Sequence, residues 1–228
     1  MPTLPFWHFV TRLGEAEILL PAALALCWWL ARRADSRPLV HRWIAWLALG
    51  ALLTTATKVA FIGWGVGSSS LNFTGISGHA MFAAAVYPTL LYVIASAQSP
   101  AKQHLAWFGG YAVALMIAVS RVMVGAHSWS EVTSGLLIGT VVSAPSLWTA
   151  RIHHRVLPLW LLVGGACWFA ITPVSAPPSA THDLVTRLAL SLSGRSRPYT
   201  RRELLHAPQP SRRPPPNAVE PLPADFAG

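Results

Sequence analysis

Residues suited to phosphoryl transfer occur at the margins of apolar segments in this chain. They are Lys58, Ser77, Gly78, His79, Arg121, His127 and Glu131. Ionisable side chains at membrane depth are costly, and they are by default candidates for function. A phosphoryl group needs fixed cations or N–H donors around its oxygens, together with a nucleophile in line with the leaving oxygen. These residue types therefore indicate phosphoryl transfer without a metal ion.

Spacing suggests a role for each residue. His127 and Glu131 are one helical turn apart, so the carboxylate can accept a hydrogen bond from one ring nitrogen and leave the other as the nucleophile. Lys58, Arg121 and the backbone of 77–78 can surround the phosphate. A second histidine, His79, can protonate the departing alkoxide and then activate water against the phosphohistidine.

Each residue also has a purely structural interpretation. Lys58 could extend its amine to the membrane interface, and His79 could simply begin a helix after a Gly/Ser turn. Arg121 could anchor a helix end. Glu131 could close a capping box with Ser128, since Ser128-Trp-Ser-Glu131 fits that pattern. The functional interpretation depends on these residues lying together.

Two motifs in the chain resemble those of a known family. Ile76-Ser77-Gly78-His79, and Ser120-Arg121 followed by His127 and Glu131, resemble the second and third signature motifs of the type 2 phosphatidic acid phosphatase and vanadium haloperoxidase superfamily, in its membrane-bound lipid phosphatase branch. Lys58 stands where the lysine of the first motif is expected. The resemblance covers residues 58–131, and the family's helical core would account for 16–149.

The resemblance implies the same roles as the residue chemistry. By it, His127 is the nucleophile, Glu131 orients its ring, and His79 is the general acid. The phosphate ligands that it implies are Lys58, Ser77, Gly78 and Arg121.

Three positions depart from the family pattern. Ile76 replaces a usual Pro, and Glu131 replaces a usual Asp. The first motif should continue to an Arg-Pro pair, but Gly65-Val66 stands there, so one phosphate-binding arginine is missing. Because charge-assisted bonds to phosphate are strong, we expect Asn72 or N–H groups of the 65–70 loop to replace part of it.

The composition predicts a membrane protein. The chain has 228 residues, of which 53% are hydrophobic and 11% are charged, against roughly 25% charged in an average soluble domain. Each helix needs about 20 apolar residues to cross a bilayer. Six apolar segments near or somewhat below this length predict an all-α, polytopic bundle of about six transmembrane helices. The predicted segments are 16–31, 43–62, 79–97, 105–119, 132–149 and 156–175. Residues 3–14 could form a further helix lying in the membrane surface.

The charge distribution predicts the orientation of the bundle. The net charge of +9 comes from basic residues in alternate connections and in the C-terminal tail, so we predict no nucleic-acid partner. If the connection around Arg32, Arg33, Arg37 and Arg42 is cytoplasmic, the loops 63–78 and 120–130 share the opposite surface. We therefore expect the site to face the non-cytoplasmic side of a bacterial-type cytoplasmic membrane.

Two regions follow from the same pattern. Residues 1–178 form the transmembrane domain, and 179–228 form a Pro/Arg-rich tail that we predict to be disordered, with a short surface helix possible at 182–192. The last segment either crosses the membrane or turns back at Gly164-Gly165. No metal-ligand spacing appears, Cys27 and Cys167 are read as packing residues, and no cofactor or removable signal peptide is expected.

The sequence thus favours a metal-independent hydrolase acting on a membrane lipid phosphate or diphosphate. It cannot choose among phosphatidic acid, phosphatidylglycerol phosphate and polyprenyl diphosphate, and it does not predict an oligomeric state. The missing arginine leaves open a catalytically weak relative that binds or transports a lipid phosphate. A vanadate-dependent peroxidase is a further alternative, disfavoured by burial in the membrane.

Overall fold

Helices form nearly all of the regular structure in the described part of the chain. The computed structural model describes residues 3–148, 158–171 and 180–206. The helices there are α1 (Leu4–Arg12), α2 (Ala16–Ala31), α3 (Arg37–Trp64), α4 (Gly78–Ile94), α5 (Pro100–Met123), α6 (Trp129–Trp148), α7 (Leu159–Ile171), α8 (Ala180–Ser193) and α9 (Arg201–His206), with short 3-10 turns at Ala34–Ser36 and Ala95–Ala97. The all-α prediction is confirmed.

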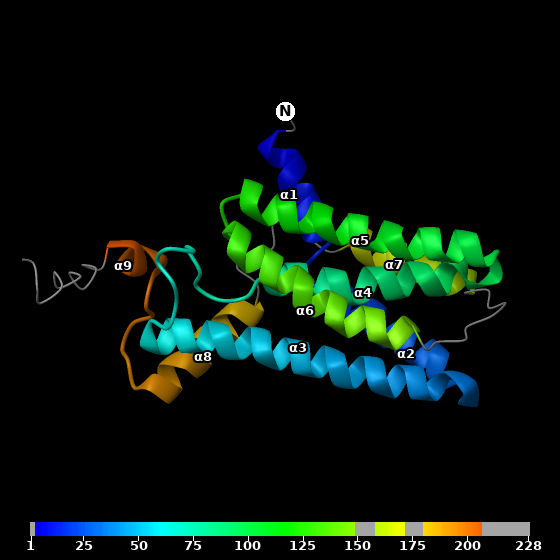
Figure 1. The fold of residues 1–228 in the computed structure, drawn as a ribbon, viewed down its shortest axis with the longest axis horizontal. Coiled ribbons are helices and arrows are strands. Elements are labelled where there is room, and N and C mark those ends of the chain that lie inside the picture. The colour runs from blue at the N-terminus through cyan, green and yellow to red at the C-terminus, as the bar shows by residue number, and fades with distance from the viewer. Residues whose placement is uncertain (1–2, 149–157, 172–179, 207–228) are drawn as a thin grey trace, which may run out of the picture.

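Helices α2 to α7 occupy the six apolar segments predicted from the sequence, with boundaries that differ by up to several residues. Within the described residues, four helical stretches are long and apolar enough to cross a membrane: Leu4–Ala31, Ala34–Trp64, Gly78–Ala97 and Pro100–Met123. The first of these joins α1 to α2. Helices α3 to α6 run side by side along the long axis of the molecule (Figure 1).

Two glycines allow α6 to pack closely against α4. A Cβ atom at Gly135 would lie 2.6 Å from the carbonyl oxygen of Ser77, and one at Gly139 would collide with the carbonyl of Met81. Small residues four apart let membrane helices approach in this way. The close approach places the first turn of α6 against the start of α4, where the backbone N–H of Ser77 donates to the carbonyl of Glu131 at 3.0 Å.

The antiparallel order of α3 to α6 brings the predicted loops together. The C-terminal end of α3, the start of α4 and the start of α6 lie at the same end of the bundle, as Figure 1 shows. Helix α3 ends at Gly65, whose left-handed φ of 73° suits a glycine at a helix terminus. The loops at 63–78 and 120–130 therefore share one surface, as the sequence predicted.

Helix α7 passes through Gly164 and Gly165 without a turn. The indole N–H of Trp168 donates to the carbonyl of Glu17 at 2.8 Å, at the start of α2. The described part of this segment is therefore one continuous helix of 13 residues, without a reversal at Gly164-Gly165. The basic connection with Arg151 and Arg155 lies outside the described residues.

Part of the predicted tail is helical, namely α8 (Ala180–Ser193) and α9 (Arg201–His206). Helix α8 covers the short helix that the sequence allowed at 182–192, and it packs Val185 and Ala189 against Val59 and Ile62 of α3. Burial of this apolar face outweighs the Pro/Arg-rich composition that predicted disorder. The rest of the tail, 207–228, lies outside the described residues.

Candidate active site

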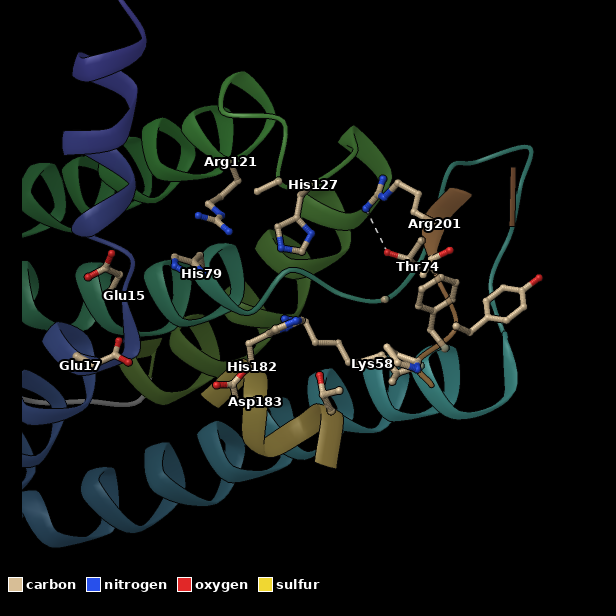
Figure 2. Close-up of a pocket in the computed structure, with 18 residues that line it drawn as sticks. Glu15, Glu17, Lys58, Thr74, His79, Arg121, His127, His182, Asp183 and Arg201 are labelled. Atoms are coloured by element: carbon tan, nitrogen blue, oxygen red, sulfur yellow. Dashed lines mark hydrogen bonds between the residues drawn. The ribbon is translucent and has the colours of Figure 1, made fainter. Parts of the chain in front are cut away.

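A cavity of about 710 Å³ lies at the loop end of the bundle. Four of the residues singled out from the sequence line it: Lys58, His79, Arg121 and His127. They come from α3, from α4, from α5 and from the loop before α6, and Figure 2 shows their side chains around the same space. The structure therefore brings together residues that are up to about seventy positions apart in the sequence.

His127 is held by Glu131 in the manner expected for a nucleophilic imidazole. Its Nδ1 lies 2.7 Å from Oε2 of Glu131, and the Glu131 side chain has no exposed surface. With Nδ1 as the donor to the carboxylate, Nε2 keeps its lone pair for chemistry.

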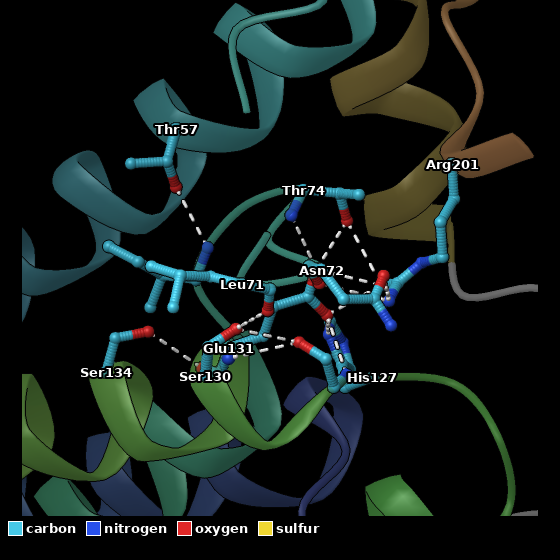
Figure 3. A network of polar contacts seen from close by, with 11 residues as sticks. Thr57, Leu71, Asn72, Thr74, His127, Ser130, Glu131, Ser134 and Arg201 are labelled. Atoms are coloured by element: carbon cyan, nitrogen blue, oxygen red, sulfur yellow. Dashed lines mark hydrogen bonds and ion pairs between the residues drawn. The ribbon is translucent and has the colours of Figure 1, made fainter. Parts of the chain in front are cut away.

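The same carboxylate also caps α6. The backbone N–H of Ser128 donates to Oε2 of Glu131 at 3.1 Å, and the N–H of Glu131 donates to the Ser128 hydroxyl at 3.4 Å. This is the capping box that the sequence offered as an alternative. The structural and functional interpretations are therefore compatible, because one oxygen accepts from the cap and from the ring (Figure 3).

The loop before α4 contacts both Lys58 and Glu131. Gly75 has a φ of 135°, and a Cβ atom there would lie 3.2 Å from the Lys58 side chain, so only a glycine fits without strain. Next to it, the backbone N–H of Thr74 donates to Oε1 of Glu131 at 2.7 Å. The loop thus positions the lysine and the carboxylate together.

Arg121 reaches the cavity from the last turn of α5. Its Nη1 donates to the hydroxyl of Thr11 at 2.9 Å, while its buried Nε–H has no hydrogen-bond partner among the described residues. A buried donor without a partner is uncommon in a folded protein. An anionic ligand in the cavity would satisfy this N–H.

Ser77 and Gly78 form the start of α4 and are not among the described residues that line the cavity. Ser77 is fully buried, and its hydroxyl oxygen has no hydrogen-bond partner among the described residues. The first amides of a helix are free to bind an anion, so the start of α4 is suited to hold a phosphate beside His79.

Several residues at the cavity were not anticipated. Glu15 and Glu17 come from the start of α2, and His182 and Asp183 from α8. His182 lies in the region 179–228 that was predicted to be a tail with a possible short helix. No motif marks these positions, because they reach the cavity only through the packing of α2 and α8.

Arg201 was also missed, and it makes the most contacts of these additions. It extends from α9 to Glu131, Thr74 and Asn72 (Figure 3). Asn72, which we expected to replace part of the missing arginine, accepts from Arg201 through its side-chain oxygen at 2.9 Å. Neither Asn72 nor any residue of 65–70 is among the described residues that line the cavity.

His127 is expected to be neutral under mildly acidic conditions. Burial lowers its pKa from the ordinary 6.5, and this outweighs the hydrogen bond to Glu131, which acts in the opposite direction. Because only the neutral ring is a nucleophile, reactivity should be lost as the pH falls through this lowered pKa. We therefore predict that diethyl pyrocarbonate modifies His127 with a half-maximal rate below pH 6.5.

Peptide mass spectrometry of the modified protein measures this rate without any substrate. N-acetylhistidine modified in parallel gives the reference curve for an unperturbed ring. A midpoint for His127 at or above that of the reference would contradict the prediction.

Comparison with known proteins identifies the family. The sequence model of the PAP2 superfamily matches residues 61–155, which include His79, Arg121, His127 and Glu131, while Lys58 lies just before the match. An "Uncharacterized 22.5 kDa protein in cps region" from Klebsiella pneumoniae is 31% identical over 202 residues, which cover 87% of this chain and 97% of the relative. No solved structure matches the chain.

Proposed function

Since the chain belongs to the PAP2 superfamily, whose members are generally phosphatases, we propose that it is an integral membrane phosphatase that acts on a lipid phosphate or diphosphate. The observation that carries the proposal is the 2.7 Å contact between Nδ1 of His127 and buried Glu131, at a cavity that Lys58 and Arg121 also line. This combination supplies a nucleophile and fixed cations in one place.

The reaction would proceed in two displacements. In the first, Nε2 of His127 attacks phosphorus, the bond from phosphorus to the leaving oxygen breaks, and protonated His79 donates its proton to that oxygen. In the second, neutral His79 takes a proton from water, whose oxygen attacks the phosphohistidine and releases phosphate. Glu131 stabilises the positive charge that develops on the His127 ring in both steps.

Lys58, Arg121 and the start of α4 would hold the non-bridging phosphate oxygens. Each already has a contact in the fold: Gly75 lies close to Lys58, the Thr11 hydroxyl accepts from Arg121, and the N–H of Ser77 donates to the backbone of α6. Preorganised donors of this kind stabilise a transition state without needing to reorient during the reaction.

A lipid substrate is favoured by the location of the cavity. Lys58 and Arg121 lie near the ends of two helices that are long and apolar enough to span a membrane. A phosphate headgroup can reach such a site while its acyl or prenyl chains stay in the bilayer. We propose that this end faces the non-cytoplasmic side of the cell membrane, because the loops 63–78 and 120–130 are poor in Lys and Arg. The basic segment 194–206 lies at the same end, and long tails can cross regardless of their charge.

The proposal is tested by phosphate release from purified protein in mixed micelles. Phosphatidic acid, phosphatidylglycerol phosphate and a polyprenyl diphosphate are offered in parallel, each with and without EDTA. We expect turnover of at least one, a change of less than about twofold in chelator, and inhibition by vanadate, because fixed cations and N–H groups of the chain carry the phosphate charge.

The same experiment separates the proposal from its main alternative. The Gly65-Val66 pair, in place of the first-motif arginine, would also suit a protein that binds or transports a lipid phosphate without hydrolysing it. Binding of phosphatidic acid without phosphate release, in a detergent that supports an active relative, would favour that alternative. Activity that EDTA abolishes and a divalent metal restores would contradict metal independence.

A further inference from the structure

Residues 194–206, here called the C-terminal clasp, close over the end of α3. Tyr199 anchors it: the backbone N–H donates to the carbonyl of Ile62 at 2.9 Å, and the ring packs edge-on against Phe61 with centroids 5.6 Å apart. A Cβ atom at Gly65 would lie 3.1 Å from the Tyr199 ring, so the clasp lies directly on the point where α3 ends. It is a packed part of the fold.

A capping box within the clasp defines the N-terminus of helix α9. Thr200 accepts a hydrogen bond from the N–H of Glu203 at 3.3 Å, and the Glu203 carboxylate accepts from the N–H of Thr200 at 2.7 Å. This capping box starts the helix at Arg201. The guanidinium of Arg201 is thereby directed toward α6.

Arg201 bridges both oxygens of Glu131. Its Nη2 lies 2.8 Å from Oε1 and 2.7 Å from Oε2, and it also donates to the Thr74 hydroxyl at 3.1 Å. Its Nη1 donates to the side-chain oxygen of Asn72 at 2.9 Å. The Arg201 side chain is 33% exposed, whereas Glu131 has no exposed surface.

A fully buried carboxylate needs a compensating charge. Without Arg201, the nearest group able to supply that charge is the ring of His127, which would gain a proton and lose its nucleophilic lone pair. With Arg201 in place, Glu131 keeps a permanent cationic partner, and the ring can stay neutral while donating through Nδ1. Figure 2 shows Arg201 beside His127, at the edge of the cavity away from His79.

We propose that Arg201 is a positioning residue, by which the C-terminal clasp fixes Glu131 and so keeps His127 oriented and neutral for attack. The kinetic part of this proposal rests on the proposed phosphatase function. Arg201 acts through Glu131 and does not take the place of the missing phosphate-binding arginine.

The test compares Arg201→Ala and Arg201→Lys with Arg202→Ala in the full-length protein. Arg202 is the exposed neighbour on the same helix, so its variant removes the same charge without touching Glu131. For the lipid phosphate that the parent hydrolyses, Arg201→Ala should lower kcat by about 10- to 100-fold with KM changed less than about threefold, as expected for a lost charge-assisted bond. Arg201→Lys should keep part of the activity, and Arg202→Ala should match the parent.

A second readout needs no substrate. The pH midpoint for diethyl pyrocarbonate modification of His127 should rise in Arg201→Ala, because the ring then compensates the buried carboxylate. The other ionisable side chains at the cavity are unchanged in these variants, namely Glu15, Glu17, Lys58, His79, Arg121, His182, Asp183 and Tyr199. The midpoint is measured on variant protein that elutes at the same volume as the parent. If the substitution affected only folding, the pH midpoint of His127 modification in this folded protein would be the same as in the parent.

Parent-like kcat in Arg201→Ala would overturn the proposal, and so would a raised KM with kcat unchanged, which would make Arg201 a substrate ligand. If no lipid phosphate is hydrolysed by the parent, the proposed function fails, but the modification midpoint still decides the role of Arg201: a rise supports it and no change overturns it. If Arg201→Ala does not fold, Arg201→Gln, which removes the charge but keeps most of the side-chain length, is judged by the same criteria.

Discussion

Replacing His127 by alanine is expected to reduce phosphate release by at least about 10⁴-fold, because removal of a catalytic nucleophile costs enzymes factors of this size or more. His79 and His182 also line the cavity, but the described hydrogen bond of Glu131 to a histidine is to His127. The proposed task of His79 is proton transfer to the leaving oxygen. Release of phosphate is measured with the lipid that the parent hydrolyses best, in matched micelles.

The His127→Ala protein should still fold. The ring's one described hydrogen bond is to Glu131, whose carboxylate retains Thr74, Ser128 and Arg201 as donors. His104→Ala is a matched control, since His104 is exposed and bonds to the Pro100 carbonyl within its own helix. In the parent, a rapid quench under basic conditions should trap an acid-labile phosphoryl adduct on His127. Substantial activity in His127→Ala would remove this residue from the reaction.

The part of the site that could be predicted from the sequence is the part encoded locally. His127 and Glu131 are one turn apart at a helix start, so their pairing follows from helical geometry, and the structure realises it at 2.7 Å. The co-location of Lys58, His79 and Arg121 follows from the alternation of membrane helices, which returns every second loop to one surface.

Contacts that depend on the packing of distant elements could not be predicted. Arg201 lies 70 residues after Glu131, in a six-residue helix surrounded by a Pro/Arg-rich composition that is typical of disorder. Its position is set by α8, whose apolar face covers the end of α3, and by Tyr199 on Gly65. No periodicity or motif in the amino-acid sequence predicts either contact.

The close contact between α6 and α4 likewise could not be predicted from the sequence. Gly135 and Gly139 permit it, but a glycine pair in an apolar segment does not indicate which helix it faces. The consequence for the site is direct, since this contact sets the start of α6 against Ser77 and the loop that carries Thr74. The position of the Glu131 carboxylate is therefore determined by tertiary packing as well as by its spacing from His127.

Glu131→Gln is expected to slow turnover on the order of 10⁴-fold, comparable to amide replacement of the orienting carboxylate in other catalytic triads. Oε1 accepts from Thr74 and Arg201, while Oε2 accepts from His127, Ser128 and Arg201. A glutamine amide has only one oxygen, so its NH₂ group would have to face hydrogen-bond donors on one side. The neutral amide also cannot balance the positive charge that develops on the His127 ring.

The two interpretations of Glu131 predict different outcomes for this change. A capping box accepts glutamine, so a residue that only caps α6 would lose at most about 1 kcal/mol of stability and no activity. Glu131→Asp distinguishes the effect of charge from that of side-chain length. It keeps the carboxylate and its negative charge but shortens the side chain by about one bond length, roughly 1.5 Å. We therefore expect the rate of phosphate release to fall in the order parent, Glu131→Asp, Glu131→Gln, measured on protein with matching thermal transitions in detergent. Equal rates for the parent and the glutamine variant would leave Glu131 as a helix cap alone. A larger loss in Glu131→Asp than in Glu131→Gln would mean that the reach of the side chain matters more than its charge.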